Sequence, residues 1–262
     1  MREPVEADLF KIEGAEWGVN RFPDGQVQFW MEPATGPVRL WASLPTSESL
    51  DLFLQMISRV RFDSVQINYL YGARSDKDRA GSREVANVAR LVLDLIEAAA
   101  PGLGVTIVAP HCPELLTTQR ATWPLHREIL ANEPGYDAIL YPDASARARF
   151  QGVAPDLPWL ECEKERDQVT GRIVRHAIPD ISDYRRLLVL DDLCDGGRTF
   201  LDIASAIGNQ VRLDLSVTHG VFSNGAIPRL LERYETIWVT NSLPSAARAA
   251  SDRVRILDVW SF

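Results

Sequence analysis

The stretch that decides the fold is LLVLDDLCDGGRTF, residues 187–200. Its apolar run Leu187–Leu190 predicts a buried parallel strand, and the carboxylates of Asp191 and Asp192 follow. A glycine-containing turn comes next, and an apolar helical pattern begins after Thr199. A tight turn at a helix start directs backbone N–H groups and the helix dipole at one point, which suits a phosphate. The carboxylates can accept hydrogen bonds from sugar hydroxyls, so the stretch predicts a sugar-phosphate site. An Asp-Asp pair can also bind a metal ion or simply end a strand.

The whole chain has the composition of a soluble globular protein. Its 262 residues, 46% apolar and 24% charged, suffice for one large domain or two small ones. The net charge of −8 disfavours nucleic acids and anionic membranes as partners. The three cysteines show no CxxC spacing, so neither a disulfide framework nor a zinc site is indicated. With no apolar signal core and no membrane-length apolar run, we expect a cytoplasmic protein.

Strand and helix patterns alternate along the chain. Apolar alternation or short apolar runs predict strands over residues 26–31, 38–42, 65–70, 105–109, 136–141, 187–190, 211–218 and 236–240. Helical spacing is clearest over 50–60 and 82–100. This alternation predicts an α/β fold with mainly parallel sheets flanked by helices. Two such runs predict two similar domains, 1–128 and 129–262, with Trp123-Pro124 and Pro134-Gly135 near their boundary.

Further segments carry polar side chains of catalytic or binding types. They are RFPDG (21–25), YGARSDKDR (71–79), APHC (109–112), YPDASARAR (141–149), EKER (163–166), THGVFS (218–223) and VTNSLP (239–244). In this order, they resemble the PRPP synthetase (ribose-phosphate diphosphokinase) family over roughly residues 20–260. The stretch 187–200 resembles a motif that this family shares with type I phosphoribosyltransferases. THGVFS is typical of PRPP synthetases and disfavours a phosphoribosyltransferase.

The resemblance implies two phosphoribosyltransferase-like domains, with ATP bound by 1–128 and ribose phosphate by 129–262. It implies transfer of the β,γ-diphosphate of ATP to the C1 hydroxyl of ribose 5-phosphate, which releases AMP and requires Mg²⁺. ATP is then a co-substrate. In the family, the loop that RFPDG resembles reaches the active site of a neighbouring subunit, which implies a homo-oligomer, at least a dimer.

The resemblance also implies roles for individual residues. Contacts to ATP are implied for Phe22, Asp24, Gln26, Arg74, Asp76 and His111. Catalysis of the transfer is implied for Lys164, Arg166, His111 and Arg74. The ribose phosphate is implied to contact Asp191, Asp192, Asp195, Gly196, Gly197, Arg198 and Thr199. Asp143 is the implied magnesium ligand, and Arg149 is implied to contact a phosphate.

The chain departs from the family pattern at several positions, which leaves two alternatives open. Arg198 stands in a loop that normally reads Thr-Gly-Gly-Thr, and its guanidinium could bind a longer 5-substituent. The acceptor would then be ADP-ribose, the product ADP-ribose 1-diphosphate, and the pathway NAD resynthesis. Ala109 replaces an aspartate associated with magnesium, and Ser145 and Ala146 replace two glycines. These changes favour a catalytically weak, regulatory subunit, whereas the retained Lys164 and the acidic pair favour an enzyme.

Overall fold

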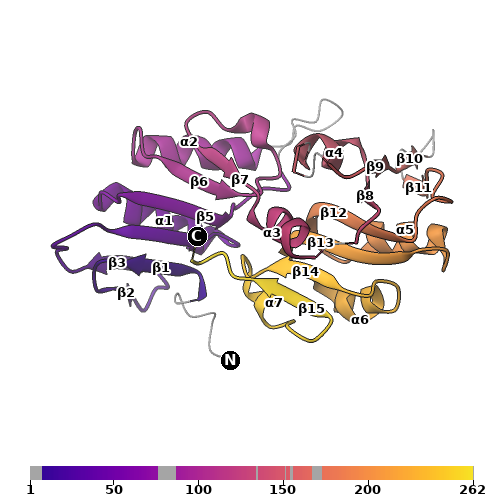
Figure 1. Cartoon of the computed structure of the whole chain (residues 1–262). Coiled ribbons are helices and arrows are strands. Elements are labelled where there is room, and N and C mark those ends of the chain that lie inside the picture. Colours follow the sequence, from indigo (N-terminus) through magenta and orange to yellow (C-terminus); the bar gives the residue numbers. More distant parts are fainter. Residues whose placement is uncertain are drawn as a thin grey trace. The chain divides into compact units, whose positions relative to one another are not determined.

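The computed structural model describes residues 8–75, 87–133, 135–150, 152–153, 156–166 and 173–261, and omits the side chains of 164–166 and 173–176. It divides into two compact units, Met1–Thr122 with Trp260–Phe262, and Trp123–Val259 (Figure 1). The sequence suggested a division after residue 128, whereas this division lies between Thr122 and Trp123. No helix in the described ranges is long and apolar enough to span a membrane.

The first unit is built on a five-stranded sheet in the order β1-β4-β5-β6-β7. Its strands are β1 (Phe10–Glu13), β4 (Arg39–Ser43), β5 (Ser64–Tyr69), β6 (Val105–Val108) and β7 (Arg120–Thr122). Only the β1–β4 pairing within this sheet is antiparallel. A separate hairpin consists of β2 (Trp17–Arg21) and β3 (Val27–Met31), and the helical segments are α1 (Ser47–Arg59), α2 (Val88–Ala99) and η2 (Pro113–Leu115).

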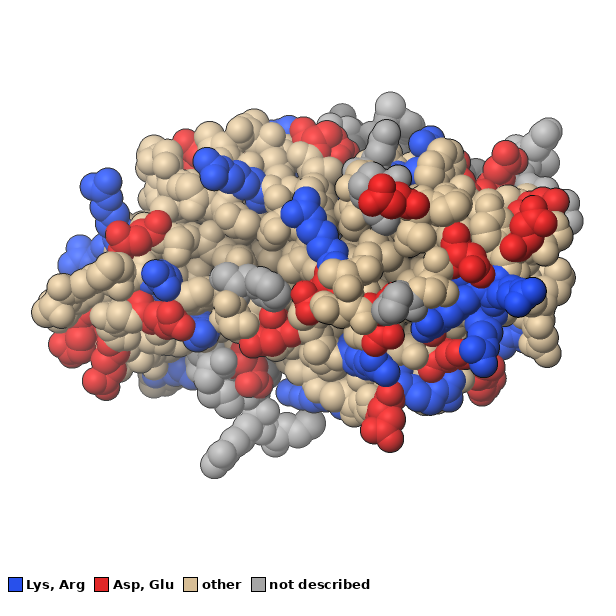
Figure 2. Space-filling view, in the orientation of Figure 1, with Lys and Arg blue, Asp and Glu red and all other residues tan. Residues whose placement is uncertain are grey.

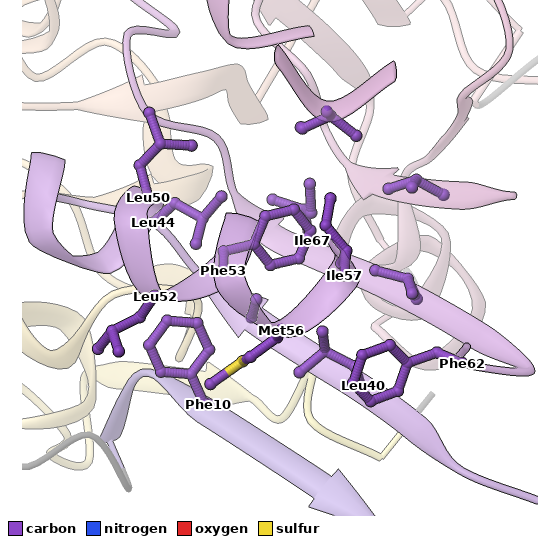
Figure 3. Packing of buried hydrophobic residues seen from close by; sticks show 14 of the residues in the cluster. Phe10, Leu40, Leu44, Leu50, Leu52, Phe53, Met56, Ile57, Phe62 and Ile67 are labelled. Atoms are coloured by element: carbon purple, nitrogen blue, oxygen red, sulfur yellow. The ribbon is translucent and has the colours of Figure 1, made fainter. Parts of the chain in front are cut away.

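Helix α1 illustrates how the sequence sets the local structure of this unit. Thr46 is its N-cap, and a capping box with Ser49 satisfies backbone N–H groups at the helix start. The apolar face of α1 then packs on the sheet, where Phe53 and Met56 are fully buried. Figure 3 shows this cluster, with Phe10 and Leu40 of the sheet beside the two helix residues.

The second unit is built on a fully parallel six-stranded sheet in the order β15-β14-β13-β12-β8-β9. Its strands are β8 (Ala138–Tyr141), β9 (Trp159–Glu161), β12 (Arg186–Cys194), β13 (Arg212–Gly220), β14 (Ile237–Thr240) and β15 (Val254–Leu257). Its helical segments are α3 (Pro124–Asn132), α4 (Ala144–Phe150), α5 (Arg198–Ile207), η3 (Ser223–Gly225), α6 (Ala226–Leu231) and α7 (Pro244–Ala247). An antiparallel hairpin of β10 (Glu163–Arg166) and β11 (Ile173–Ala177) completes it.

Both faces of this sheet are buried, as expected for parallel strands. Leu187 and Val189 of β12 share one apolar cluster with residues of α5. Leu188 and Leu190 point the other way and pack with residues of α3 and α4. The predicted α/β class with mainly parallel sheets flanked by helices is confirmed.

The surface of the protein carries charges of both signs. On the face shown in Figure 2, basic and acidic side chains are interspersed.

A buried carboxylate ties the amino ends of the central strands together. Asp214 of β13 is almost fully buried and accepts hydrogen bonds from Arg186 Nε (3.1 Å) and Nη2 (2.6 Å). It also accepts from the Tyr136 hydroxyl (3.0 Å) and from the backbone N–H of Thr236 (2.9 Å). These four bonds connect β13 with β12 and with the segments that lead into β8 and β14, so they fix strands whose other ends carry the candidate site.

Several predicted element boundaries were wrong. Strand β12 continues past Leu190 to Cys194, so the two carboxylates lie inside the strand. Helix α5 begins at Arg198, two residues earlier than the apolar pattern suggested. Strand β15 was not predicted. Part of the helix predicted over 82–100 lies outside the described residues, and α2 occupies the rest.

Candidate ribose-phosphate site

Asp191 and Asp192 lie near the carboxyl end of β12, at the centre of the second sheet. The register pairs Asp191 with Val217 and Leu193 with His219, so Asp192 lies beside Thr218 of β13. The side chains of Asp191 and Asp192 are 18% and 2% exposed. Burial and the neighbouring Asp192 carboxylate raise the pKa of Asp191 well above its usual range. Two carboxylates are thus held close together at low solvent exposure.

Arg149, in the last turn of α4, places one positive charge against this acidic pair. Its Nη1 donates to Asp191 Oδ1 at 3.2 Å and to Asp192 Oδ1 at 2.8 Å. The Arg149 side chain is only 8% exposed. The positive charge of Arg149 lowers the pKa of Asp191, because it favours the ionised carboxylate. It therefore opposes the rise in this pKa that burial and Asp192 cause. The predicted phosphate contact of Arg149 stays a prediction, and its guanidinium contacts both carboxylates and lies over the Phe150 ring at 6.0 Å.

The glycine turn and the start of α5 form a candidate phosphate cradle. Gly197 is the N-cap residue of α5 and has φ of 76°, a conformation that favours glycine. A Cβ at this position would lie 3.3 Å from three side-chain atoms of Leu230. Because the N-cap residue has no side chain, it cannot cap the first helical turn, which begins with Arg198 and Thr199. The N–H groups of this turn and the helix dipole therefore suit an anion.

Arg229 of α6 fixes the cradle, and sequence reasoning missed it. Its Nη2 donates to the carbonyl oxygens of Gly196 (3.2 Å) and Asn224 (3.1 Å), and its Nε donates to that of Gly225 (3.3 Å). It thereby joins the cradle to the loop after β13, where Phe222 and Asn224 have positive φ. Bonds to backbone carbonyls leave no side-chain pattern in the sequence, so no motif could have identified this arginine.

A buried histidine lies behind Asp192 and was also missed. His126 of α3 is fully buried, with Nδ1 2.8 Å from Ser216 Oγ and Nε2 3.3 Å from Thr218 Oγ1. Burial lowers the pKa of His126 to about 3, so its ring is neutral near pH 7. The one available signal was a histidine on a helix beside apolar residues, which more often indicates a core residue.

The THGVFS string begins in the same buried polar layer. Thr218 and His219 are buried at the end of β13, and His219 Nδ1 lies 2.9 Å from Ser242 Oγ. The Thr218 carbonyl accepts from Thr240 Oγ1 at 2.7 Å, which links β13 to β14. Gly220 is required sterically, because a Cβ there would overlap the ring of Phe222. The first three residues of this string therefore support the strand edge that carries the acidic pair.

Other predicted residues of the second unit have more local partners. Asp143 Oδ1 accepts from the backbone N–H of Ala146 at 2.8 Å, as a helix cap does for α4. The Arg198 side chain is 89% exposed and pairs with Asp202 at 3.4 Å. Asp195 leads from β12 into the glycine turn. Lys164 and Arg166 belong to β10, but their side chains lie outside the described residues.

The predicted ATP residues of the first unit lie on two features of that unit. Phe22, Asp24 and Gln26 form the tip of the β2–β3 hairpin, where the N–H of Gly25 donates to the Phe22 carbonyl and Asp24 Oδ1 accepts from the N–H of Gln26. Arg74 follows β5, and His111 follows β6, which is its parallel neighbour. These two therefore come from strand ends at one edge of the sheet. Asp76 lies outside the described residues.

No group of three or more His, Cys, Asp or Glu side chains that could hold a metal ion occurs in the described part of the chain. Mg²⁺ often binds by one or two carboxylates together with substrate phosphates and water. Asp143 is a carboxylate of the type that such a site uses, and its bond to the N–H of Ala146 fixes its position.

Comparison with known proteins gives consistent results, although no family model matches the chain. The ribose-phosphate pyrophosphokinase of Caldanaerobacter subterraneus is 24% identical over 273 residues, which cover 97% of this chain and 86% of that protein. The putative ribose-phosphate pyrophosphokinase of Streptomyces coelicolor is 29% identical over 237 residues, which cover 82% of this chain and 72% of that protein. The enzyme of Bradyrhizobium diazoefficiens is 30% identical over 129 residues, only 40% of its length.

A solved structure supports the same fold. The crystal structure of phosphoribosylpyrophosphate synthetase from Mycobacterium smegmatis has a TM-score of 0.75 at 20% identity, covering 94% of this chain and 86% of that chain. Two of the relatives match across most of the sequence, and the solved structure has a similar fold. These matches support a resemblance to the ribose-phosphate pyrophosphokinases over most of the chain.

Proposed function

We propose that this protein transfers the β,γ-diphosphoryl group of ATP to the C1 hydroxyl of ribose 5-phosphate and releases AMP. The observation that carries the proposal is the placement of the acidic pair and the glycine turn on one strand–turn–helix segment, residues 191–199. The carboxylates suit the 2- and 3-hydroxyls, and the start of α5 suits the 5-phosphate. Relatives named ribose-phosphate pyrophosphokinase support an activity of this kind.

The transfer requires positive charge around the migrating group, since catalysis of phosphoryl transfer is mostly positioning and charge stabilisation. We assign that role to Lys164 and Arg166 of β10, together with Arg74 and His111. Mg²⁺ would neutralise the ATP phosphates when bound, with Asp143 as a protein ligand. The C1 hydroxyl then attacks the β-phosphorus, and the bond to the α-phosphate oxygen of AMP breaks.

The adenine of ATP would lie at the hairpin tip of Phe22, Asp24 and Gln26, where an exposed aromatic ring can stack on a base. In the family that this chain resembles, the loop corresponding to this hairpin tip reaches the active site of a neighbouring subunit. We therefore propose a homo-oligomer, at least a dimer.

ADP-ribose is the second candidate acceptor, because the exposed Arg198 guanidinium at the cradle could meet a longer 5-substituent. Its contact with Asp202 and its exposure equally suit a solvent-facing side chain, so ribose 5-phosphate is the acceptor we favour.

The experiment is AMP release from Mg-ATP, with ribose 5-phosphate and ADP-ribose as separate acceptors. We expect AMP with ribose 5-phosphate, and a much lower rate with Asp192→Asn. AMP mainly with ADP-ribose, lost in Arg198→Ala, would support the NAD-related alternative. Measurable ATP binding without AMP from either acceptor would contradict the proposal and favour the regulatory subunit.

A further inference from the structure

Two arginines of α4 have opposite surroundings. Arg147 is partly exposed, pairs with Glu161 and lies over the ring of Trp159 at 4.8 Å. Arg149 is 8% exposed, and its Nη1 contacts both carboxylates of the acidic pair, at 3.2 Å and 2.8 Å. Two turns of one helix thus hold one surface arginine and one buried arginine. They form a matched pair for mutagenesis.

A single nitrogen of Arg149 lies where a bridging cation would lie. Nη1 contacts the Oδ1 atoms of Asp191 and Asp192 at the same time. Adjacent carboxylates are also the oxygen ligands that Mg²⁺ and Mn²⁺ prefer. Since a guanidinium is always charged and has no acceptor, it competes directly with a metal ion for these oxygens.

The surroundings of the pair make a counter-ion necessary. The Asp192 side chain is 2% exposed, so an uncompensated negative charge there is strongly unfavourable. His126 lies behind it with both ring nitrogens near the hydroxyls of Ser216 and Thr218. Because burial lowers the pKa of His126 to about 3, this ring supplies no charge at neutral pH. Arg149 does supply a positive charge, in direct contact with both acids.

We propose that Arg149 is a positioning residue that serves as the counter-ion of Asp191 and Asp192 and keeps divalent cations out of the pair. Given the proposed function, on which this consequence rests, Arg149 leaves the pair to the ribose hydroxyls, while Mg²⁺ stays on the ATP phosphates.

The test is a Mn²⁺ titration of the full chain without nucleotide, with free Mn²⁺ measured by electron paramagnetic resonance. Arg149→Gln should gain one Mn²⁺ per chain relative to the unmodified protein, and the gain should disappear in Arg149→Gln/Asp192→Asn. Arg149→Lys retains the charge and should gain none. Arg147→Gln changes the neighbouring surface arginine and should also gain none.

Two results would overturn the proposal. One is a folded Arg149→Gln protein, judged by circular dichroism, that binds no more Mn²⁺ than the unmodified protein. The other needs no Arg149 variant: it is a difference in bound Mn²⁺ between the unmodified protein and Asp192→Asn, which the proposal predicts to bind equal numbers. One fewer in Asp192→Asn would show that the pair binds a cation with Arg149 present.

Steady-state kinetics separate positioning from general damage. Arg149→Gln should raise the KM for ribose 5-phosphate by about tenfold or more, with a smaller change in kcat and no change in the KM for Mg-ATP. Arg149→Lys should restore part of the loss. If no acceptor yields AMP, the proposed function fails, whereas the Mn²⁺ titration still decides the role of Arg149.

Discussion

Replacement of Gly197 by alanine should weaken both the fold and the phosphate cradle, and the neighbouring Gly196 provides a matched control. Gly197 has φ of 76°, which costs an L-residue about 1–2 kcal/mol. The new Cβ would also lie 3.3 Å from three atoms of the fully buried Leu230, so that side chain must shift. Reduced freedom of the unfolded chain returns about 0.4–1 kcal/mol. Adding about 1 kcal/mol for the crowded contact, we expect a net loss of about 1–2.5 kcal/mol.

Gly196→Ala should behave differently, although it lies next in the chain. Its φ is not positive, and the nearest atom to a new Cβ is Ser223 Oγ at 3.8 Å. The lower entropy of the unfolded chain should leave this variant as stable as the unmodified protein or slightly more stable. The two variants should therefore differ by about 2 kcal/mol in the free energy of unfolding.

The assay is equilibrium unfolding in urea followed by circular dichroism, combined with the KM for ribose 5-phosphate. Gly197→Ala should unfold at lower urea and raise this KM more than the KM for ATP, since the change displaces the start of α5. Equal urea midpoints and equal KM values for Gly196→Ala and Gly197→Ala would refute the reasoning, because the two substitutions differ mainly in φ and in the contact with Leu230.

Three further predictions concern charges and buried groups. Asp214→Asn weakens a buried carboxylate with four donors and should cost about 3 kcal/mol of unfolding free energy in urea, whereas a loss below about 1 kcal/mol would contradict it. The pKa of His126, lowered by burial to about 3, lies below its unfolded value near 6.5, so the unfolded state binds more protons between these values. Stability should thus fall with decreasing pH in that range by up to about 1.4 kcal/mol per unit, and His126→Gln should flatten the profile; parallel profiles would count against this. Lys164→Ala should lower turnover by about 10²-fold or more, and unchanged kcat would exclude its catalytic role.

The sequence predicted the parallel sheets well because buried parallel strands are continuous apolar runs, such as Leu187–Leu190. The same rule ended that strand too early. The backbone pairing with β13 continues through Asp192, which is buried beside the hydroxyl of Thr218 and the ring of His126. Periodicity cannot show that a polar residue remains in a strand when its partners come from distant segments.

The candidate site has a part that could be predicted from the sequence and a part that could not. The glycine turn and the acidic pair lie within one short segment, so their local order was readable from the sequence. Arg149 is 42 and 43 residues away from its two partners, and Arg229 is 33 residues from Gly196. Such long-range contacts depend on how helices pack on the sheet. The sequence therefore indicated what the cradle could bind, but not which cations hold it in place.

The central claim is transfer of a diphosphoryl group to C1 of ribose 5-phosphate, and ³¹P nuclear magnetic resonance of one reaction mixture tests it most directly. With Mg-ATP and ribose 5-phosphate, the account predicts AMP and a sugar with an intact 5-phosphate and a diphosphate on C1, in equal amounts. ADP together with a sugar that gained a single phosphate would contradict it, as would an unchanged spectrum from protein that binds both substrates.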